Sequence, residues 1–135
     1  MKVFIDTNVW LSGRFLPGLC AQLLEALIES GIDLLLDERV LDEFRRVARD
    51  KLGVDQALLA RTDSFFLRYA QIVPAAQAPA PDVPDPDDAW ILAAALNAGA
   101  HWFVTGDKAL LGLGTLGEMA ILSPRTVYER LISLR

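Results

Sequence analysis

Four acidic residues occupy positions from which their side chains can meet in the folded chain. Asp6 directly follows a short apolar segment, Asp107 ends another, Asp88 begins an alanine-rich segment, and Glu43 lies within an amphipathic one. Carboxylates that gather in one place repel one another unless protons or a cation compensate their charge. Because hard oxygen ligands suit Mg²⁺ or Mn²⁺, the four acids predict a divalent-metal site, provided that the fold brings them together.

The apolar segments before Asp6 and Asp107 are typical of buried strands. They are short, rich in β-branched and aromatic residues, and continuous rather than alternating, as in a parallel sheet that is covered on both faces. The predicted strands are 2–5, 32–37, 70–74 and 101–107, with a weaker one at 118–122.

Segments with helical periodicity separate these strands. Their apolar residues recur at helical spacing, and Gly31 and Gly53 act as stop signals. Residues 74–86 hold five of the seven prolines and are predicted to form an extended connector. Strands that alternate with helices indicate an α/β fold, with a parallel sheet between helix layers. The predicted helices are 19–29, 38–53, 56–70, 87–100, a short one after residue 107 and a last one from Pro124.

A parallel sheet also predicts where the acids lie. Ligands bind beyond the carboxyl ends of parallel strands, so Asp6 and Asp107 meet at one edge if their strands are neighbours. Asp88 opens a helix, and helix starts in such folds lie over the same edge. Glu43 lies about 100° around its helix from Phe44, at the border of the apolar face, where it can be half-buried and reach inward.

Structural roles also explain each acid taken alone. Residues 85–88, Asp-Pro-Asp-Asp, form a good helix start, with an Asp N-cap, Pro at the first position and acids near the positive end of the helix dipole. The two acids that follow strands can serve as turn or N-cap residues, and Glu43 can pair with Arg39 or Arg46. These explanations are independent of one another, whereas a single site accounts for all four acids.

In order and spacing, these segments resemble the PIN-domain family of metal-dependent ribonucleases, which includes the VapC-type toxins of bacterial toxin–antitoxin pairs. The similarity spans almost the whole chain. It consists of an Asp-Thr-Asn after the first strand, an acid on an amphipathic helix, an Asp that begins a helix, and a strand followed by Thr-x-Asp. The segments are FIDTN (4–8), VLDEFRRV (40–47), PDDAWILAAAL (86–96) and FVTGDKALL (103–111).

The resemblance implies a single PIN-like domain over residues 1–135, a three-layer α/β/α sandwich with a central parallel β-sheet. It implies that the four acids hold one or two divalent ions, Mg²⁺ or Mn²⁺, and that Asn8 and Thr105 orient the acids and a water. Asp87 competes with Asp88 as a ligand, although the spacing to Ile91 favours Asp88, and Asp85 can add an outer charge. The implied catalytic residues are Asp6, Asn8, Glu43, Asp88, Thr105 and Asp107, and the implied metal ligands are Asp6, Glu43, Asp88 and Asp107.

The activity that the resemblance implies is divalent-metal-dependent hydrolysis of RNA phosphodiester bonds by the toxin of a toxin–antitoxin pair. RNA would be the substrate, a protein antitoxin encoded nearby the partner, and a homodimer a compatible assembly. Two alternatives stay open within the family. One is a catalytically silent PIN-like module that acts by binding RNA or protein, and the other is a housekeeping nuclease of RNA processing.

Two other classes with acids at strand ends fit the sequence less well. A haloacid-dehalogenase-like phosphatase needs a second Asp at the position of Asn8. A phospho-receiver domain needs a second acid beside Asp6 and a phosphoacceptor in mid-sheet, which residues 32–40 supply poorly. The metal-dependent nuclease is therefore the favoured interpretation.

The composition limits how such a protein can bind RNA. The chain has 13 basic and 18 acidic residues, a net charge of −5, which argues against charge-driven binding to nucleic acid or to an anionic membrane. Phosphates would have to be contacted by local basic groups. The candidates are Arg14, in a predicted loop, Arg45, Arg46, Arg49 and Lys108.

The remaining composition indicates a globular protein of the cytoplasm. Hydrophobic residues make up 53% of the chain, enough for a sizeable core. The single Cys and the single His exclude an internal disulfide and a Cys/His zinc cage, which fits a reducing compartment. No apolar stretch approaches the ~18 residues of a membrane span.

Overall fold

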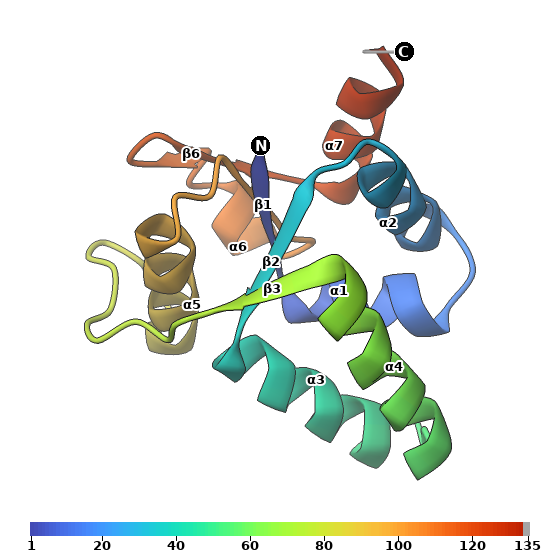
Figure 1. Ribbon diagram of the computed structural model, residues 1–135. Helices are drawn as coiled ribbons and strands as arrows, with labels where there is room; N and C mark the ends of the chain where they lie inside the picture. Colours follow the sequence, from blue (N-terminus) through green and yellow to red (C-terminus); the bar gives the residue numbers. More distant parts are fainter. Residues whose placement is uncertain (134–135) are drawn as a thin grey trace.

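At the centre of the computed structural model, which describes residues 1–133, lies a six-stranded sheet (Figure 1). Its strands lie in the order β3 (Ala70–Val73), β2 (Asp33–Asp37), β1 (Lys2–Ile5), β4 (Trp102–Val104), β6 (Met119–Leu122) and β5 (Thr115–Leu116). Neighbouring strands pair in parallel, except that β5 pairs antiparallel with β6. The first strand of the chain therefore lies in the interior of the sheet, between β2 and β4.

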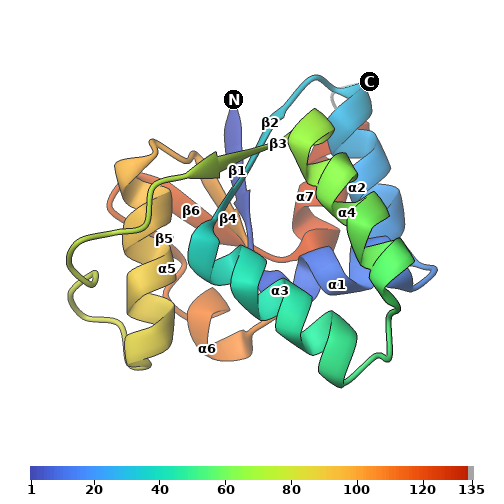
Figure 2. The same cartoon turned by 60° about the horizontal axis from the view of Figure 1, so that its bottom comes forward.

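Helices lie on both sides of this sheet. They are α1 (Thr7–Phe15), α2 (Leu19–Glu29), α3 (Glu38–Asp50), α4 (Gln56–Tyr69), α5 (Pro86–Asn97), α6 (Lys108–Leu111) and α7 (Pro124–Ser133). Helix α5 lies on one side, and α2, α4 and α7 lie on the other (Figures 1 and 2). The predicted three-layer α/β/α sandwich with a central parallel β-sheet is confirmed, and the unpredicted β5 is its antiparallel exception. None of the helices described is long and apolar enough to cross a membrane.

Burial on both faces explains why β1, β2 and β4 are continuous apolar segments. Residues 3–5 of β1 are all 0% exposed. Phe4 pairs in register with Leu35 of β2 on one side and with Phe103 of β4 on the other, where the two Phe rings stack at 5.5 Å. Since a strand in such a sheet has no solvated face, Asp6 is the first polar residue that this strand can place beyond the core.

Residues 7–15 form helix α1, where the sequence predicted a loop around Arg14. The helix is only nine residues long and contains Gly13, so its intrinsic propensity is low. The Asp6 side chain caps it by accepting the first backbone N–H, and Trp10, which is 0% exposed, anchors it in the core. Burial against the rest of the protein therefore stabilises this helix. The periodicity of so short a segment does not reveal that burial.

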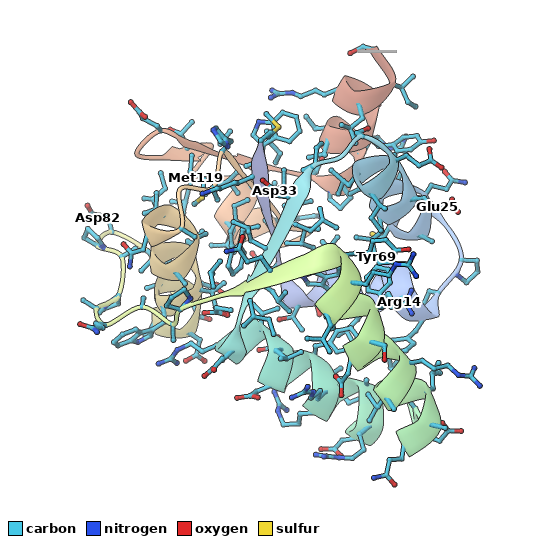
Figure 3. All side chains as sticks on the ribbon, viewed as in Figure 1. Arg14, Glu25, Asp33, Tyr69, Asp82 and Met119 are labelled. Carbon is cyan, nitrogen blue, oxygen red and sulfur yellow. The ribbon has the colours of Figure 1, made fainter. Side chains whose placement is uncertain are left out.

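The proline-rich connector between β3 and α5 is only partly extended, whereas the sequence predicted an extended one. It turns at residues 81–82, where Asp82 has a φ of 63°. Residues 74–85 contain no helix or strand and pass along the outer side of α5, where Asp82 lies (Figure 3). The backbone N–H of Ala80 donates to the carbonyl of Ala89 at 2.9 Å. This hydrogen bond fastens the connector to the first turns of α5 and so helps to fix where that helix begins.

Gly13 allows α1 and α2 to approach closely. A Cβ at this position would overlap the Leu24 side chain, with its Cγ at 2.9 Å, and would lie 3.1 Å from the carbonyl oxygen of Cys20. We therefore expect Gly13→Ala to lower the free energy of unfolding by about 1–2 kcal/mol in urea denaturation, even though Ala is the better helix former.

Gly106→Ala is the matched control, because no atom lies within 4 Å of the position that its added methyl group would take. We expect that variant to stay within about 0.5 kcal/mol of the wild type. Equal stability of the two variants would show that the α1–α2 contact adjusts without strain.

Candidate functional site

The pairing of β1 with β4 brings Asp6 and Thr105 together. Ile5 and Val104 are register partners, and the backbone N–H of Asp6 donates to the carbonyl of Val104 at 2.9 Å. The residues that follow the two strands therefore emerge side by side at the carboxyl edge of the sheet. Figure 2 shows α1, α3, α5 and α6 around this edge.

Hydrogen bonds fix the orientation of the Asp6 carboxylate. Its Oδ1 accepts the backbone N–H of Thr7 at 2.9 Å, and its Oδ2 accepts the Thr105 hydroxyl at 2.8 Å. The Thr105 oxygen in turn accepts the backbone N–H of Asp107 at 3.0 Å. Thr105 is 0% exposed, so it acts as a buried link between Asp6 and the backbone of Asp107.

Asp107 is held at the same edge by the start of α6. Its Oδ1 accepts the backbone N–H groups of Ala109 and Leu110 at 2.8 and 3.2 Å. The predicted N-cap role of Asp107 is thus confirmed. It occupies one carboxylate oxygen, whereas Oδ2 accepts no hydrogen bond from the described part of the chain.

Asp88 lies in the first turn of α5, and its environment disfavours ionisation. Asp85 caps this helix by accepting the backbone N–H of Asp87 at 2.9 Å. Burial, followed by the negative charges of Asp85, Asp6 and Asp107, raises the pKa of Asp88 to about 6. Residues 85–88 therefore do form a helix start, as the structural explanation predicted. The charges of Asp6 and Asp107 also act on Asp88, which a helix start alone does not explain.

Glu43 reaches the cluster from α3. It is half-buried, as its place at the border of the apolar face predicted, and its charge helps to raise the pKa of Asp6. The alternative of an ion pair with Arg39 or Arg46 is not realised, because the ion pairs that α3 forms within residues 1–133 are Arg45–Asp63 and Arg49–Asp50.

No basic side chain of the described residues pairs with the negative charge of the cluster. Burial is the main cause that raises the pKa of Asp6; hydrogen bonds from Thr105 and Thr7 oppose it, and the charges of Glu43 and Asp107 add to it. Across residues 1–133, none of the four predicted ligands forms an ion pair with a Lys or Arg. The arrangement leaves the compensation of charge to protons or to a bound cation.

The roles of Asn8, Arg14 and His101 differ from those of the four acids. Asn8 is exposed on the first turn of α1 and makes no side-chain hydrogen bond to the described residues, so its orienting role stays a prediction. Arg14 lies on the side of the molecule away from α5 (Figure 3), with its guanidinium 4.0 Å from the Phe65 ring centre. The single histidine, His101, accepts the backbone N–H of Lys2 at the opposite edge of the sheet.

Asp37 is a strand-end acid to which the sequence analysis gave no role. It ends β2 and caps α3 by accepting the backbone N–H of Val40 at 2.9 Å. Its side chain is fully buried, its Oδ2 has no hydrogen-bond partner among the described residues, and burial raises its pKa. By fixing the start of α3, Asp37 positions the helix that carries Glu43.

The donor set fits a hard divalent cation better than any other group. The cluster offers carboxylate oxygens, uncompensated charge and no sulfur or imidazole. Within residues 1–133, however, no three His, Cys, Asp or Glu side chains form a group that could enclose a metal ion by themselves. Mg²⁺ keeps several of its waters and is held through one or two carboxylates, so the residues present fit a hydrated ion.

Asp88 makes the stability of the metal-free protein depend on pH. Its pKa lies at about 6 in the folded chain, above the ordinary value of 3.8. Between these values the folded state keeps a proton that the unfolded state has released, so this contribution to stability falls as the pH rises from about 4 to 6. We expect Asp88→Asn, measured by urea denaturation in chelator, to be more stable than the wild type at pH 7 by about 1–2 kcal/mol.

The stability difference between Asp88→Asn and the wild type should shrink towards zero below about pH 4. Asp33→Asn is the matched control, because Asp33 is an exposed residue at the amino end of β2. A destabilised Asp88→Asn variant at pH 7 would contradict the expected repulsion.

Comparisons with known proteins agree with this geometry. One chain of the crystal structure of VapBC2 from Rickettsia felis, bound to a DNA fragment from their promoter, superposes with a TM-score of 0.66 at 15% sequence identity. The superposition covers 91% of this chain and 98% of that chain, and at this identity it establishes the shared fold. No curated protein matches the sequence. A family model described as "PIN domain" matches residues 2–109, and the chain therefore belongs to the PIN-domain family.

Proposed function

We propose that this PIN domain is a divalent-metal-dependent ribonuclease that hydrolyses phosphodiester bonds of RNA at the carboxyl edge of its sheet. The observation that supports the proposal is the proximity of the four acids Asp6, Glu43, Asp88 and Asp107, whose charges add to burial in raising the pKa values of Asp6 and Asp88. Helix capping explains the positions of Asp6 and Asp107 but not why four acids without a basic partner lie close together, so a ligand or a reaction is the better explanation.

Asp6, Glu43, Asp88 and Asp107 would hold the metal. A divalent ion bound there would acidify a water and neutralise negative charge on a phosphate. Hydrogen bonds within the protein hold two of these carboxylates in fixed orientations. Thr105 and the Thr7 N–H fix Asp6, and two N–H groups of α6 hold Asp107 while leaving one of its oxygens available.

While no cation is bound to it, Asp88 is the residue of this cluster best suited to exchange a proton. A group whose pKa lies near the working pH is the most effective general acid or base, and the pKa of Asp88 is about 6. His101 cannot take this part, because it lies at the opposite edge of the sheet and its Nδ1 accepts a backbone hydrogen bond. In our proposal, binding of the cation therefore releases the Asp88 proton, and a water acidified by the metal needs no histidine as its base.

We further propose that the protein is the toxin of a toxin–antitoxin pair. Support comes from family membership over residues 2–109 and from the likeness in fold to a chain of VapBC2. The partner would be a small antitoxin protein encoded nearby, and a homodimer is compatible with the proposal. Co-expression with the product of the adjacent reading frame would test the partner independently of any cleavage assay.

Cleavage of RNA should depend on the metal and on the acids. We expect the purified protein to cleave a mixed pool of structured RNAs with Mn²⁺ or Mg²⁺ and not with chelator. Asp6→Asn/Asp88→Asn should reduce the rate roughly 100-fold or more, because it removes two of the charges that hold the cation. Gel analysis of end-labelled RNA measures both effects.

The matched control is Asp33→Asn/Asp82→Asn, which changes the net charge equally. Asp33 lies at the amino end of β2, and Asp82 lies on the connector outside α5 (Figure 3). This double variant should cleave like the wild type. Metal binding without cleavage of any RNA would favour the silent binding module, and cleavage confined to one stable RNA precursor would favour a processing nuclease.

Glu43 should contribute to metal affinity. Because it forms no ion pair within residues 1–133 and its charge acts on Asp6, we expect Glu43→Gln to weaken Mn²⁺ binding about 10-fold or more in calorimetric titration. Glu25→Gln, an exposed change on α2, is the control. Unchanged affinity in Glu43→Gln would remove Glu43 from the ligand set.

A further inference from the structure

A pocket between α3 and α5 adjoins the acid cluster. Its volume is about 360 Å³, at the lower end of the range for small-molecule sites. It shares Glu43 with the cluster, and Asp87 on its other wall is the neighbour of Asp88. The residues that line it are Arg39, Asp42, Glu43, Arg46, Asp87 and Ile91.

The arginines of α3 fall into two pairs with different surroundings. Arg45 and Arg49 are engaged in ion pairs with acidic residues, at 2.9 Å in each case. Arg39 and Arg46 line the pocket instead and form neither an ion pair nor a side-chain hydrogen bond with the described residues. These two arginines lie one turn before and one turn after Glu43 on the same helix. They do not form ion pairs with Glu43, although it lines the same pocket.

Arg39 is held in place by an aromatic ring. Its guanidinium lies over the ring of Trp90, 4.8 Å from the ring centre. Trp90 itself is half-buried in α5 and packs against the core. A cation–π contact of this kind restricts the long side chain without using any of its N–H donors. The donors of Arg39 therefore stay available at the edge of the pocket.

We propose that this pocket is the subsite for the nucleotide next to the scissile bond of a single-stranded RNA, in which Arg39 and Arg46 contact backbone phosphates. The inference rests on the proposed ribonuclease function and adds the residues that bind the substrate. The guanidinium fork matches phosphate oxygens. A chain with a net charge of −5 needs such local contacts, since its overall field repels RNA.

The mixture of arginines and acids in the pocket favours a nucleotide over a simple anion. Phosphate oxygens accept hydrogen bonds from the arginines, whereas ribose hydroxyls and base amino groups can donate to carboxylates such as Asp42. A volume of about 360 Å³ suits one nucleotide of an unpaired strand, whose base and ribose edges are free to reach the pocket walls. Its neighbour along the strand would then lie at the acid cluster.

Binding to RNA in a cleavage-deficient background tests the subsite. In Asp6→Asn protein, we expect Arg39→Ala/Arg46→Ala to weaken binding of a fluorescein-labelled, unstructured RNA of mixed sequence at least 10-fold in fluorescence anisotropy. The slope of log affinity against log salt should fall by about 1.4, because two phosphate contacts are lost from a single strand. Both arginines are exposed, so the fold should persist, and circular dichroism with thermal melting verifies that it does.

The matched control is Arg45→Ala/Arg49→Ala, which removes two positive charges from the same helix. Because those arginines are already paired, affinity should change less than about 3-fold and the salt slope should stay nearly constant. Equal weakening by the two double variants would overturn the subsite, since it would mean that RNA affinity depends only on the total positive charge of the helix. Absence of RNA binding in the Asp6→Asn background would overturn it as well.

Cleavage by the otherwise wild-type chain distinguishes failure of the subsite from failure of the proposed function. Metal-dependent cleavage of the same RNA by the Arg39→Ala/Arg46→Ala variant with unchanged KM would overturn the subsite while supporting the ribonuclease. A raised KM with kcat little changed would support both. If the wild type cleaves no RNA, the ribonuclease proposal fails by itself, and the subsite falls with it unless the selective loss of RNA binding is still observed.

Discussion

The parallel pairing of β1 with β4 is the constraint on which the rest of the site depends. It joins segments that are 99 residues apart through the hydrogen bond from the Thr105 hydroxyl to Asp6 and through the backbone bond from Asp6 to Val104. Without that pairing, Asp6 would be a helix cap and Asp107 a separate one. With it, the two caps lie at one edge of the sheet, and the starts of α3 and α5 bring further acids to them.

When they are ionised, the clustered acids at this edge lower the stability of the fold. Burial and like charge disfavour the ionised forms of Asp6 and Asp88, while hydrogen bonds to Asp6 and Asp107 offset part of that cost. The structure tolerates the repulsion because each acid comes from a different, well-anchored element. Family membership over residues 2–109 and the uncompensated charge of this edge together support the nuclease proposal.

Sequence reasoning was most successful where a local pattern has one physical meaning. Continuous apolar segments predicted the buried parallel strands, and the border position on α3 predicted a half-buried Glu43.

Sequence reasoning was weaker where tertiary contacts decide which side chains pair. In the sequence, Asp37 and Asp6 each follow an apolar segment, and in the structure each caps a helix. Yet Thr105 is bonded to Asp6, whereas Asp37 keeps a buried oxygen without a partner in the described chain. Likewise, no pattern in α3 separates the paired Arg45 from the unpaired Arg39 and Arg46.

The place of β1 in the interior of the sheet has a consequence for the chain as it is made. β1 is synthesised long before its neighbour β4, which begins only at Trp102, and Asp107 follows later still. A nascent chain on the ribosome therefore carries Asp6 and Glu43 long before Thr105 and Asp107 can join them. For as long as β4 is inside the exit tunnel, the four carboxylates are not assembled, so under the ribonuclease proposal this cluster becomes active only after most of the chain has left the ribosome.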